Sequence, residues 1–159
     1  MTEGHATDLD DLRVVADYQF GAGAGDALFP ADADIELSRS RSGRPRQVYV
    51  EGDRVTSYGT DGRFTLGVAG GRRLYDSLDG DAYVVRVGDE SVPFVSDGKN
   101  AFAKFVTDAD PAVRSGDEVC VVGPDGDLLG VGRAELSADA MLDFEAGMAV
   151  RVREGADEE

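Results

Sequence analysis

Short apolar runs alternate with breaks rich in glycine and aspartate along most of the chain, a pattern that predicts many short elements. From Leu9 to Ala16 the apolar residues recur at helical spacing, and Thr7 or Asp8 is expected to cap the N-terminus of that helix. The glycine-rich stretch 21–25 is expected to end it. Four alternating runs bounded by turn residues then predict strands, and a second helix follows. The strands are expected at residues 35–38, 47–50, 54–58 and 63–67, and the helix at residues 68–78.

The second half holds more strand patterns than the first. A helical turn is expected at residues 90–95, and Pro124-Asp125-Gly126 has the residue types of a tight hairpin turn. Ser137 is a suitable N-cap for a short helix before the last strand. About six short strands with one or two small helices predict a compact β-barrel. Its clearest strands are expected at residues 83–87, 102–106, 118–122, 128–132 and 148–152.

The acidic break Asp79-Gly80-Asp81 separates the two halves. We therefore expect two domains, a small α+β domain over residues 8–80 and the β-barrel over residues 81–155. The fold class predicted for the whole chain is α+β. A chain of 159 residues is long enough for one ordinary domain or two small ones, which agrees with this division.

Acidic side chains outnumber basic ones by 32 to 16, so the formal net charge is −16. Such a charge repels nucleic acid at low ionic strength. It also fits a halophilic protein in a salty cytosol, where salt at about 1 M shortens the Debye length to roughly 3 Å. Only groups in direct contact then govern binding. Adaptation to high salt is the preferred interpretation, and an acidic protein with a basic partner is the alternative.

Several classes of protein are excluded by simple features. No apolar run approaches the roughly 18 residues that a membrane span needs, and residues 1–11 lack the basic and apolar regions of a signal peptide. Cys120 is the only cysteine, which excludes an internal disulfide and a multi-cysteine zinc site. We expect a soluble cytoplasmic protein without a membrane partner.

No group of residues has the arrangement of a catalytic site. His5 is the only histidine and lies in the N-terminal tail, so no Ser/His or Cys/His pair can be built. Cys120, within Glu-Val-Cys-Val-Val, is interpreted as a buried apolar residue. The stretch 21–26 resembles a dinucleotide-binding fingerprint, but Asp26 stands where the third glycine is required. We therefore expect no catalytic residue, no cofactor and no metal.

Arginines stand out against this acidic background in one segment. Arg39, Arg41, Arg44 and Arg46 fall within eight positions that contain no acid. A guanidinium group binds phosphate through two hydrogen bonds, and this contact persists when long-range attraction is screened. The segment is a candidate for contacts with a polyanion, and a solvated loop with surface ion pairs is the alternative. Weaker candidates of the same kind are Arg72 and Arg73.

The only two lysines, Lys99 and Lys104, lie close together in the second half. In a strand at 102–106, Lys104 would share a face with Phe102, because side chains alternate. Arg151 and Arg153 would likewise share one face of the last strand. If the two strands are neighbours, the four cations converge on one patch. Ordinary charge on a sheet surface is the alternative.

Four segments of the second half resemble the PUA domain, which is named after pseudouridine synthase and archaeosine transglycosylase. The resemblance covers residues 81–155 and keeps the order and spacing of the family's motifs. The segments are Ser91–Val106, Arg114–Val119, Gly130–Ala134 and Gly147–Arg153. Three segments of the first half resemble the small domain that precedes PUA in archaeal tRNA-guanine transglycosylases and related archaeosine proteins. They are Val14–Gly21, Leu28–Pro30 and Thr60–Leu66.

The resemblance implies a mixed β pseudo-barrel that holds RNA by its helical shape and by a protruding single-stranded end, often the acceptor stem and terminus of tRNA. In such domains a glycine-rich loop and the last strand approach the RNA. Gly98 would let the backbone come close to a phosphate or base, and Lys99 and Lys104 would supply charge. The transglycosylase's catalytic barrel, its aspartates and its zinc site have no counterpart in this sequence. Carried over by position, the RNA-binding residues are Gly98, Lys99, Asn100, Ala101, Phe102, Lys104, Met148, Val150, Arg151 and Arg153.

These observations favour a non-catalytic RNA-binding protein that binds tRNA or another structured RNA in support of an archaeosine-type modification. Its expected partners are RNA and a separate tRNA-modifying enzyme. The alternative is an assembly subunit of a transglycosylase-like enzyme, with protein contacts and no RNA binding of its own. A stand-alone enzyme is the third hypothesis, and the lack of a nucleophile, base or ligand cluster argues against it.

Overall fold

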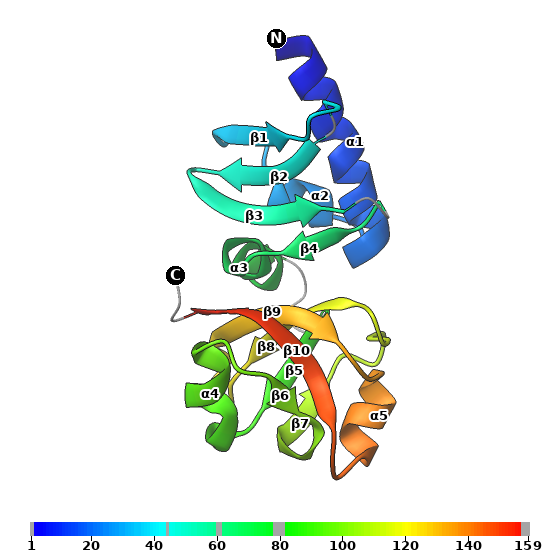
Figure 1. Ribbon diagram of the computed structural model, residues 1–159, viewed down its shortest axis with the longest axis vertical. Coiled ribbons are helices and arrows are strands. Elements are labelled where there is room, and N and C mark those ends of the chain that lie inside the picture. The colour runs from blue at the N-terminus through cyan, green and yellow to red at the C-terminus, as the bar shows by residue number, and fades with distance from the viewer. Residues whose placement is uncertain (1, 44, 60–61, 78–81, 157–159) are drawn as a thin grey trace. The chain divides into compact units, whose positions relative to one another are not determined.

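The computed structural model describes residues 2–43, 45–59, 62–77 and 82–156, with backbone alone for residues 2–8 (Figure 1). The chain divides into two compact units, residues 1–78 and residues 79–159. The expected domain break at residues 79–81 lies outside the described residues.

The first unit begins with a long helix, α1 (Thr2–Phe20), followed by the short helix α2 (Ala24–Leu28). The prediction that Thr7 or Asp8 caps the first helix was wrong, because α1 starts at Thr2 and both residues lie within it. No proline precedes Thr7, so nothing in the sequence stops the helix there. Helix α2 was not predicted either. Gly25 is buried in it, and a Cβ there would collide with the backbone of Arg13, so this glycine allows α1 and α2 to pack closely.

Four strands of the first unit form an antiparallel sheet in chain order, and the helix α3 (Val68–Ser77) follows them. The predicted strands are confirmed to within two residues at each end. Phe29 and Phe64, whose ring centroids are 5.6 Å apart, are completely buried in the core. The amide of Gln19 donates to the carbonyl of Phe64 and accepts from its N–H, both at 2.8 Å, and so joins α1 to the sheet. The strands are β1 (Ile35–Arg39), β2 (Pro45–Val50), β3 (Asp53–Tyr58) and β4 (Phe64–Leu66).

The second unit is a mixed sheet of six strands in the order β6-β10-β9-β8-β5-β7, in which β5 and β8 are parallel and the other pairs antiparallel. Two short helices, α4 (Val92–Ser96) and α5 (Ala138–Asp143), accompany the sheet. The predicted α+β class, with a mixed β pseudo-barrel in the second half, is confirmed. The strands are β5 (Val84–Val87), β6 (Ala101–Phe102), β7 (Val106–Ala109), β8 (Glu118–Val122), β9 (Leu128–Ala134) and β10 (Met148–Gly155).

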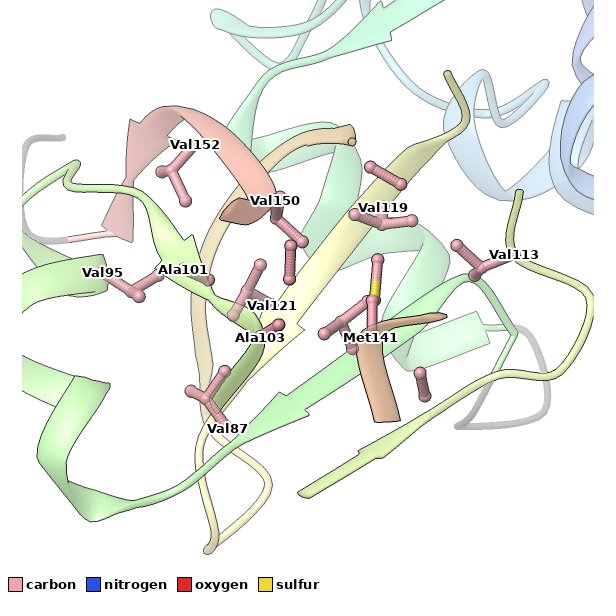
Figure 2. Packing of buried hydrophobic residues seen from close by; sticks show 14 of the residues in the cluster. Val87, Val95, Ala101, Ala103, Val113, Val119, Val121, Met141, Val150 and Val152 are labelled. Atoms are coloured by element: carbon pink, nitrogen blue, oxygen red, sulfur yellow. The ribbon is translucent and has the colours of Figure 1, made fainter. Parts of the chain in front are cut away.

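Valine and alanine side chains from these strands meet in one core together with Met141 of α5 (Figure 2). Two local predictions that position this core are confirmed. The Ser137 side chain accepts a hydrogen bond from the Ala140 N–H at 3.3 Å and caps α5. Gly126, with a φ of 86°, turns the chain between β8 and β9.

The strand predicted at residues 102–106 is wrong in its middle. Strand β6 ends at Phe102, a 3₁₀ turn η2 (Ala103–Phe105) follows, and β7 begins at Val106. The turn is needed because β6 pairs with β10 whereas β7 pairs with β5. The Ala103 N–H donates to the Gly147 carbonyl at 2.9 Å, and the buried Ala103 side chain anchors the turn in the core. Lys104 therefore lies on a turn and does not share a strand face with Phe102.

Candidate nucleic-acid interface

A surface pocket of about 530 Å³ lies in the second unit where the end of β6, the turn η2 and the loop before β10 meet. The short 3₁₀ turn η1 (Asp89–Ser91), helix α4 and the loop after it supply the remaining wall. The lining residues between 91 and 105 come from one stretch of the chain, and the pairing of β6 with β10 brings the distant loop 145–147 beside it. The lining residues are Ser91, Phe94, Lys99, Asn100, Phe102, Lys104, Phe105, Glu145, Ala146 and Gly147.

Aromatic rings give the pocket its apolar character. Phe94 and Phe102 are 56% and 45% exposed, which is high for phenylalanine, and Phe105 is half-buried. Their positions follow from the local structure. Helix α4 buries Val95 in the core and leaves the neighbouring Phe94 in solvent, and β6 buries Ala101 while Phe102 faces outward. Exposed rings in a hollow are a typical surface for stacking a planar ligand.

Both lysines of the chain line the same pocket and keep their ammonium groups near solvent. The Lys99 Nζ lies 4.0 Å from Asp97 Oδ2, and both side chains are largely exposed, so this ion pair is weak. The Lys104 Nζ lies 5.0 Å from the centroid of the Phe105 ring, a cation–π arrangement. Each ammonium group can therefore donate hydrogen bonds to an anion.

Backbone and amide contacts hold the loop that carries Lys99. Gly98, with a φ of 89°, ends α4, and its N–H donates to the Val95 carbonyl at 2.9 Å. The Asn100 Oδ1 accepts from the Val152 N–H at 3.0 Å and joins the loop to β10. A Cβ on Gly155 would collide with the backbone of Ser96 and Gly98, so the end of β10 packs directly on the loop. Gly98 and Asn100 thus position this wall of the pocket.

The two arginines of the last strand lie elsewhere on the second unit. Strands β6 and β10 are neighbours and Arg151 and Arg153 share the exposed face of β10, as predicted. Neither arginine lines the pocket, and both are paired. The Arg151 Nε lies 3.7 Å from Glu135 Oε1, and the Arg153 Nη1 donates to Glu118 Oε1 at 2.7 Å. The four cations therefore do not all line the pocket, and carboxylates hold the two arginines.

The structure brings four of the ten sequence-predicted contact residues together in the pocket, namely Lys99, Asn100, Phe102 and Lys104. The side chains of Ala101 and Val150 are completely buried in the core, so at these two positions only the backbone is left for a contact with RNA. Met148 is half-buried and pairs with Phe102 across β10 and β6.

The sequence-based search missed six lining residues. Of these six, only Phe94 could have been found from the sequence. In a short helical turn that buries Val95, the neighbouring Phe94 is expected to be exposed. The others reach the pocket through tertiary contacts that local patterns do not reveal. They are Ser91, Phe105, Glu145, Ala146 and Gly147.

The arginine-rich segment forms the tip of the β1–β2 hairpin in the first unit. Arg41 and Arg46 are exposed, and Arg44 lies outside the described residues. The Arg39 Nη1 donates to the Gly43 carbonyl at 2.9 Å and stiffens the tip. On α3, Arg72 is exposed and Arg73 is half-buried. The hairpin of the first unit therefore presents Arg41 and Arg46 to solvent.

Burial raises the pKa of the Cys120 thiol from its ordinary value of 9.0 to about 12, and the negative charge of Glu118 adds to the effect. The thiol is therefore protonated at neutral pH and is a poor nucleophile. The interpretation of Cys120 as a buried apolar residue is confirmed. Within the described part of the chain, no helix has the length and apolar character to cross a membrane.

The two halves of the chain match two family models. Residues 10–81 match the patch-forming domain C2 of tRNA-guanine transglycosylase, and residues 83–156 match the PUA domain. A tRNA-guanine(15) transglycosylase of Methanothermobacter thermautotrophicus is 45% identical over 149 residues, which are 93% of this chain and 23% of that protein. One of Thermococcus kodakarensis is 43% identical over 147 residues, 92% of this chain and 25% of that protein. The chain thus spans about a quarter of the length of the curated relatives it matches.

Two solved structures share the fold over most of the chain. A hypothetical protein of Pyrococcus horikoshii has a TM-score of 0.74 and 22% identity over 94% of this chain and 90% of its own. A conserved PUA domain protein of Thermoplasma acidophilum has a TM-score of 0.66 and 18% identity over 92% of this chain and 89% of its own. At this level of identity the two likenesses show the fold alone.

Proposed function

Since the chain contains a C2 domain of the tRNA-guanine transglycosylase type and a PUA domain, we propose that it is a non-catalytic RNA-binding protein whose ligand is tRNA or another structured RNA. The pocket of the second unit is the proposed contact for an unpaired end of that RNA. A PUA domain and the names of the relatives support this proposal.

The observation that carries the proposal is the presence of exposed aromatic rings and two solvent-exposed lysines in one pocket. Phe94 and Phe102 offer apolar surfaces on which bases stack, and such stacking contributes about 1–3 kcal/mol per base. Lys99 and Lys104 supply the charge that phosphates need. An unpaired nucleotide presents both a flat base and a phosphate, so it matches both features of the pocket.

The strong negative charge of the chain is compatible with this function in concentrated salt. At about 1 M salt the Debye length is roughly 3 Å, so the net charge of −16 no longer repels RNA from a distance. The lysines act at contact range and keep their effect. We therefore place the protein in a halophilic cytoplasm, in support of archaeosine-type modification of tRNA.

The chemistry itself is assigned to a separate polypeptide. The chain spans about a quarter of the relatives named as transglycosylases, and its sequence offers no nucleophile with a base. In this proposal the protein holds the RNA while a tRNA-modifying enzyme acts on it. Further RNA contacts are proposed for the hairpin tip with Arg39, Arg41, Arg44 and Arg46, for Arg72 and Arg73 on α3, and for Met148, Arg151 and Arg153 on β10.

A second candidate function, assembly with an enzyme through protein contacts alone, is favoured by one feature of the first unit. Val14 and Tyr18 lie one turn apart on α1 and are 55% and 89% exposed. Adjacent exposed apolar side chains on a helix are typical of a protein contact. This candidate predicts that the protein associates with such an enzyme but does not bind RNA.

The two candidates are separated by measuring the affinity of the purified protein for tRNA at high salt, by fluorescence anisotropy. We expect binding that weakens at least tenfold when Lys99 and Lys104 are both replaced by alanine. Arg114→Ala removes an exposed cation of the same unit outside the pocket and should leave the affinity nearly unchanged. Equal affinities for all three proteins would overturn the pocket assignment, and no binding at all would favour the assembly function.

A further inference from the structure

Strand β1 lies at one edge of the sheet of the first unit, and within the described residues no strand pairs with its outer side (Figure 1). It has five residues and is the longest of the described edge strands, because β4, β6 and β7 have three, two and four. An edge strand offers main-chain N–H and carbonyl groups to a further strand. The side chains along β1 therefore decide which strand it can accept.

The main chain of Leu37 points towards the outer side of β1. The Glu51 N–H donates to the Asp34 carbonyl at 2.8 Å. In an antiparallel pair, residues that exchange hydrogen bonds with the neighbouring strand alternate with residues that do not. Counting from Asp34, the main chains of Glu36 and Ser38 face β2, so the N–H and carbonyl of Leu37 point away from it. Leu37, at the centre of the strand, can thus pair with a second strand.

The apolar face of β1 is incompletely covered. Ile35 and Leu37 are half-buried, whereas Val50 and Val48, which pair with them on β2, are almost completely buried. The difference arises because β2 has a strand on each side, whereas β1 has β2 alone among the described strands. A further strand with apolar residues at the same positions would remove these two side chains from water.

Opposite charges lie at the two ends of β1. Acidic residues lie before the strand and at its beginning, whereas no acid occurs between residues 37 and 50, the segment that contains all four arginines of the hairpin. The exposed charges without an ion pair within the described residues are Asp32, Asp34 and Glu36 at the acidic end and Arg41 at the basic end. These side chains can therefore form ion pairs with another molecule.

Charges on an edge strand usually prevent two copies of a protein from pairing, because like charges meet. Antiparallel pairing of β1 with β1 of a second copy has the opposite effect, since the acidic end of each strand lies beside the basic end of the other. Centred on Leu37, this register places Arg41 of one copy opposite Ala33 of the other, between Asp32 and Asp34. A two-fold axis relates the copies, so the contact occurs twice. We propose that the protein dimerises in this way and joins two four-stranded sheets into one.

Two charge reversals test the pairing, with the dimer dissociation constant measured by sedimentation equilibrium in one high-salt buffer. Arg41→Glu leaves acids on both sides of the contact, and Asp34→Lys places cations on both sides. Because the contact occurs twice, we expect either variant to raise the dissociation constant roughly tenfold or more. An equimolar mixture of the two variants should regain nearly the unmodified affinity, because each contact then joins opposite charges again.

Matched controls are Arg114→Glu and Asp125→Lys, which reverse exposed charges of the second unit. Alone or mixed, they should dissociate like the unmodified protein. Hydrogen exchange shows whether β1 itself forms the contact. The Leu37 amide should exchange more slowly as the concentration of unmodified protein rises through the dissociation constant. In Arg41→Glu at the same concentrations it should continue to exchange fast.

Four results would overturn the inference. They are a protein that stays monomeric at all concentrations, a dimer that neither reversal weakens, variants with the unmodified circular dichroism spectrum that do not associate when mixed, and a Leu37 amide that exchanges equally fast in monomer and dimer. A monomeric protein whose Arg41→Glu variant binds tRNA more weakly would assign this arginine to RNA alone. The proposed RNA binding does not require the dimer, so the two proposals can fail separately.

Discussion

Arg153 of β10 donates to the buried carboxylate of Glu118 on β8, across the intervening strand β9. This pair ties three strands of the second unit together and uses an arginine that the sequence pattern assigned to RNA. Because Glu118 is nearly inaccessible, the guanidinium of Arg153 helps to stabilise its charge.

We expect Arg153→Ala to lower the free energy of unfolding by about 2 kcal/mol, since it removes a partner from a buried carboxylate. Urea denaturation measures this loss. Arg151→Ala is the matched control, because the pair of Arg151 with Glu135 is more exposed, and it should cost less than about 0.5 kcal/mol. Equal losses in both variants would contradict the structural role of Arg153.

The hydrogen bond from the Val152 N–H to Asn100 leads to a second prediction. Asn100→Ala should destabilise the unit by about 1 kcal/mol and loosen the loop that carries Lys99. Hydrogen exchange of the Val152 amide should become faster. Asn100→Asp retains an acceptor at the same place and should preserve the protection of that amide. If the Val152 amide exchanged at an unchanged rate in Asn100→Ala, the hydrogen bond to Asn100 would contribute nothing to the stability of this part of the unit.

Cys120 gives a prediction about pH. Its pKa is raised from 9.0 to about 12 in the folded protein, mainly by burial and also by the charge of Glu118. The unfolded chain therefore releases the thiol proton above pH 9 while the folded chain retains it. The contribution of the protonated Cys120 thiol to the free energy of unfolding is complete below pH 9 and is lost as the pH rises towards 12.

Denaturation curves between pH 8 and 11 test this linkage by comparing the unmodified protein with Cys120→Ala. Other groups affect both proteins alike, so the difference in unfolding free energy should shrink as the pH rises above 9. A difference that stays constant with pH would contradict the raised pKa of Cys120.

The contact between α3 and the sheet is tested at Gly70. A Cβ there would collide with the carbonyl of Val55, so Gly70→Ala should cost more than about 3 kcal/mol. Gly43 is the control, because it has a φ of 86° but open space around it. Gly43→Ala should cost only about 1 kcal/mol of backbone strain, measured by the same denaturation method.

Most of the fold could be predicted because its elements follow local rules. Strands β1–β4 were found from alternation and turn residues, and the Ser137 cap and the Gly126 turn from side-chain chemistry. The misplaced strand at residues 102–106 has a different cause. Apart from Lys104 the run is apolar, and it gives no sign that the chain changes its pairing partner from β10 to β5, which only tertiary structure determines.

Only the part of the candidate site that comes from one short segment of the chain could be predicted from the sequence. Lys99, Asn100, Phe102 and Lys104 form one short segment, and they do line the pocket. Glu145 comes from a distant loop, and the sheet register alone places it there. The carboxylate partner of Arg153 is likewise 35 positions away, so the sequence pattern could not show that this arginine is held by a buried carboxylate.

The hairpin tip of the first unit allows the proposed secondary RNA contacts to be tested apart from the pocket. Arg41 and Arg46 are exposed at the tip, and replacing both by alanine removes two phosphate-binding groups without changing buried residues. We expect the affinity for full-length tRNA to fall by roughly fivefold to tenfold at moderate salt, with a shallower dependence on salt concentration. The affinity for a short hairpin that offers only a stem and an unpaired end should stay the same. The double variant Lys99→Ala and Lys104→Ala should weaken the binding of both RNAs. A loss of hairpin binding in the arginine variant, or an unchanged affinity of that variant for tRNA, would contradict the proposed contacts and assign these arginines to surface ion pairs.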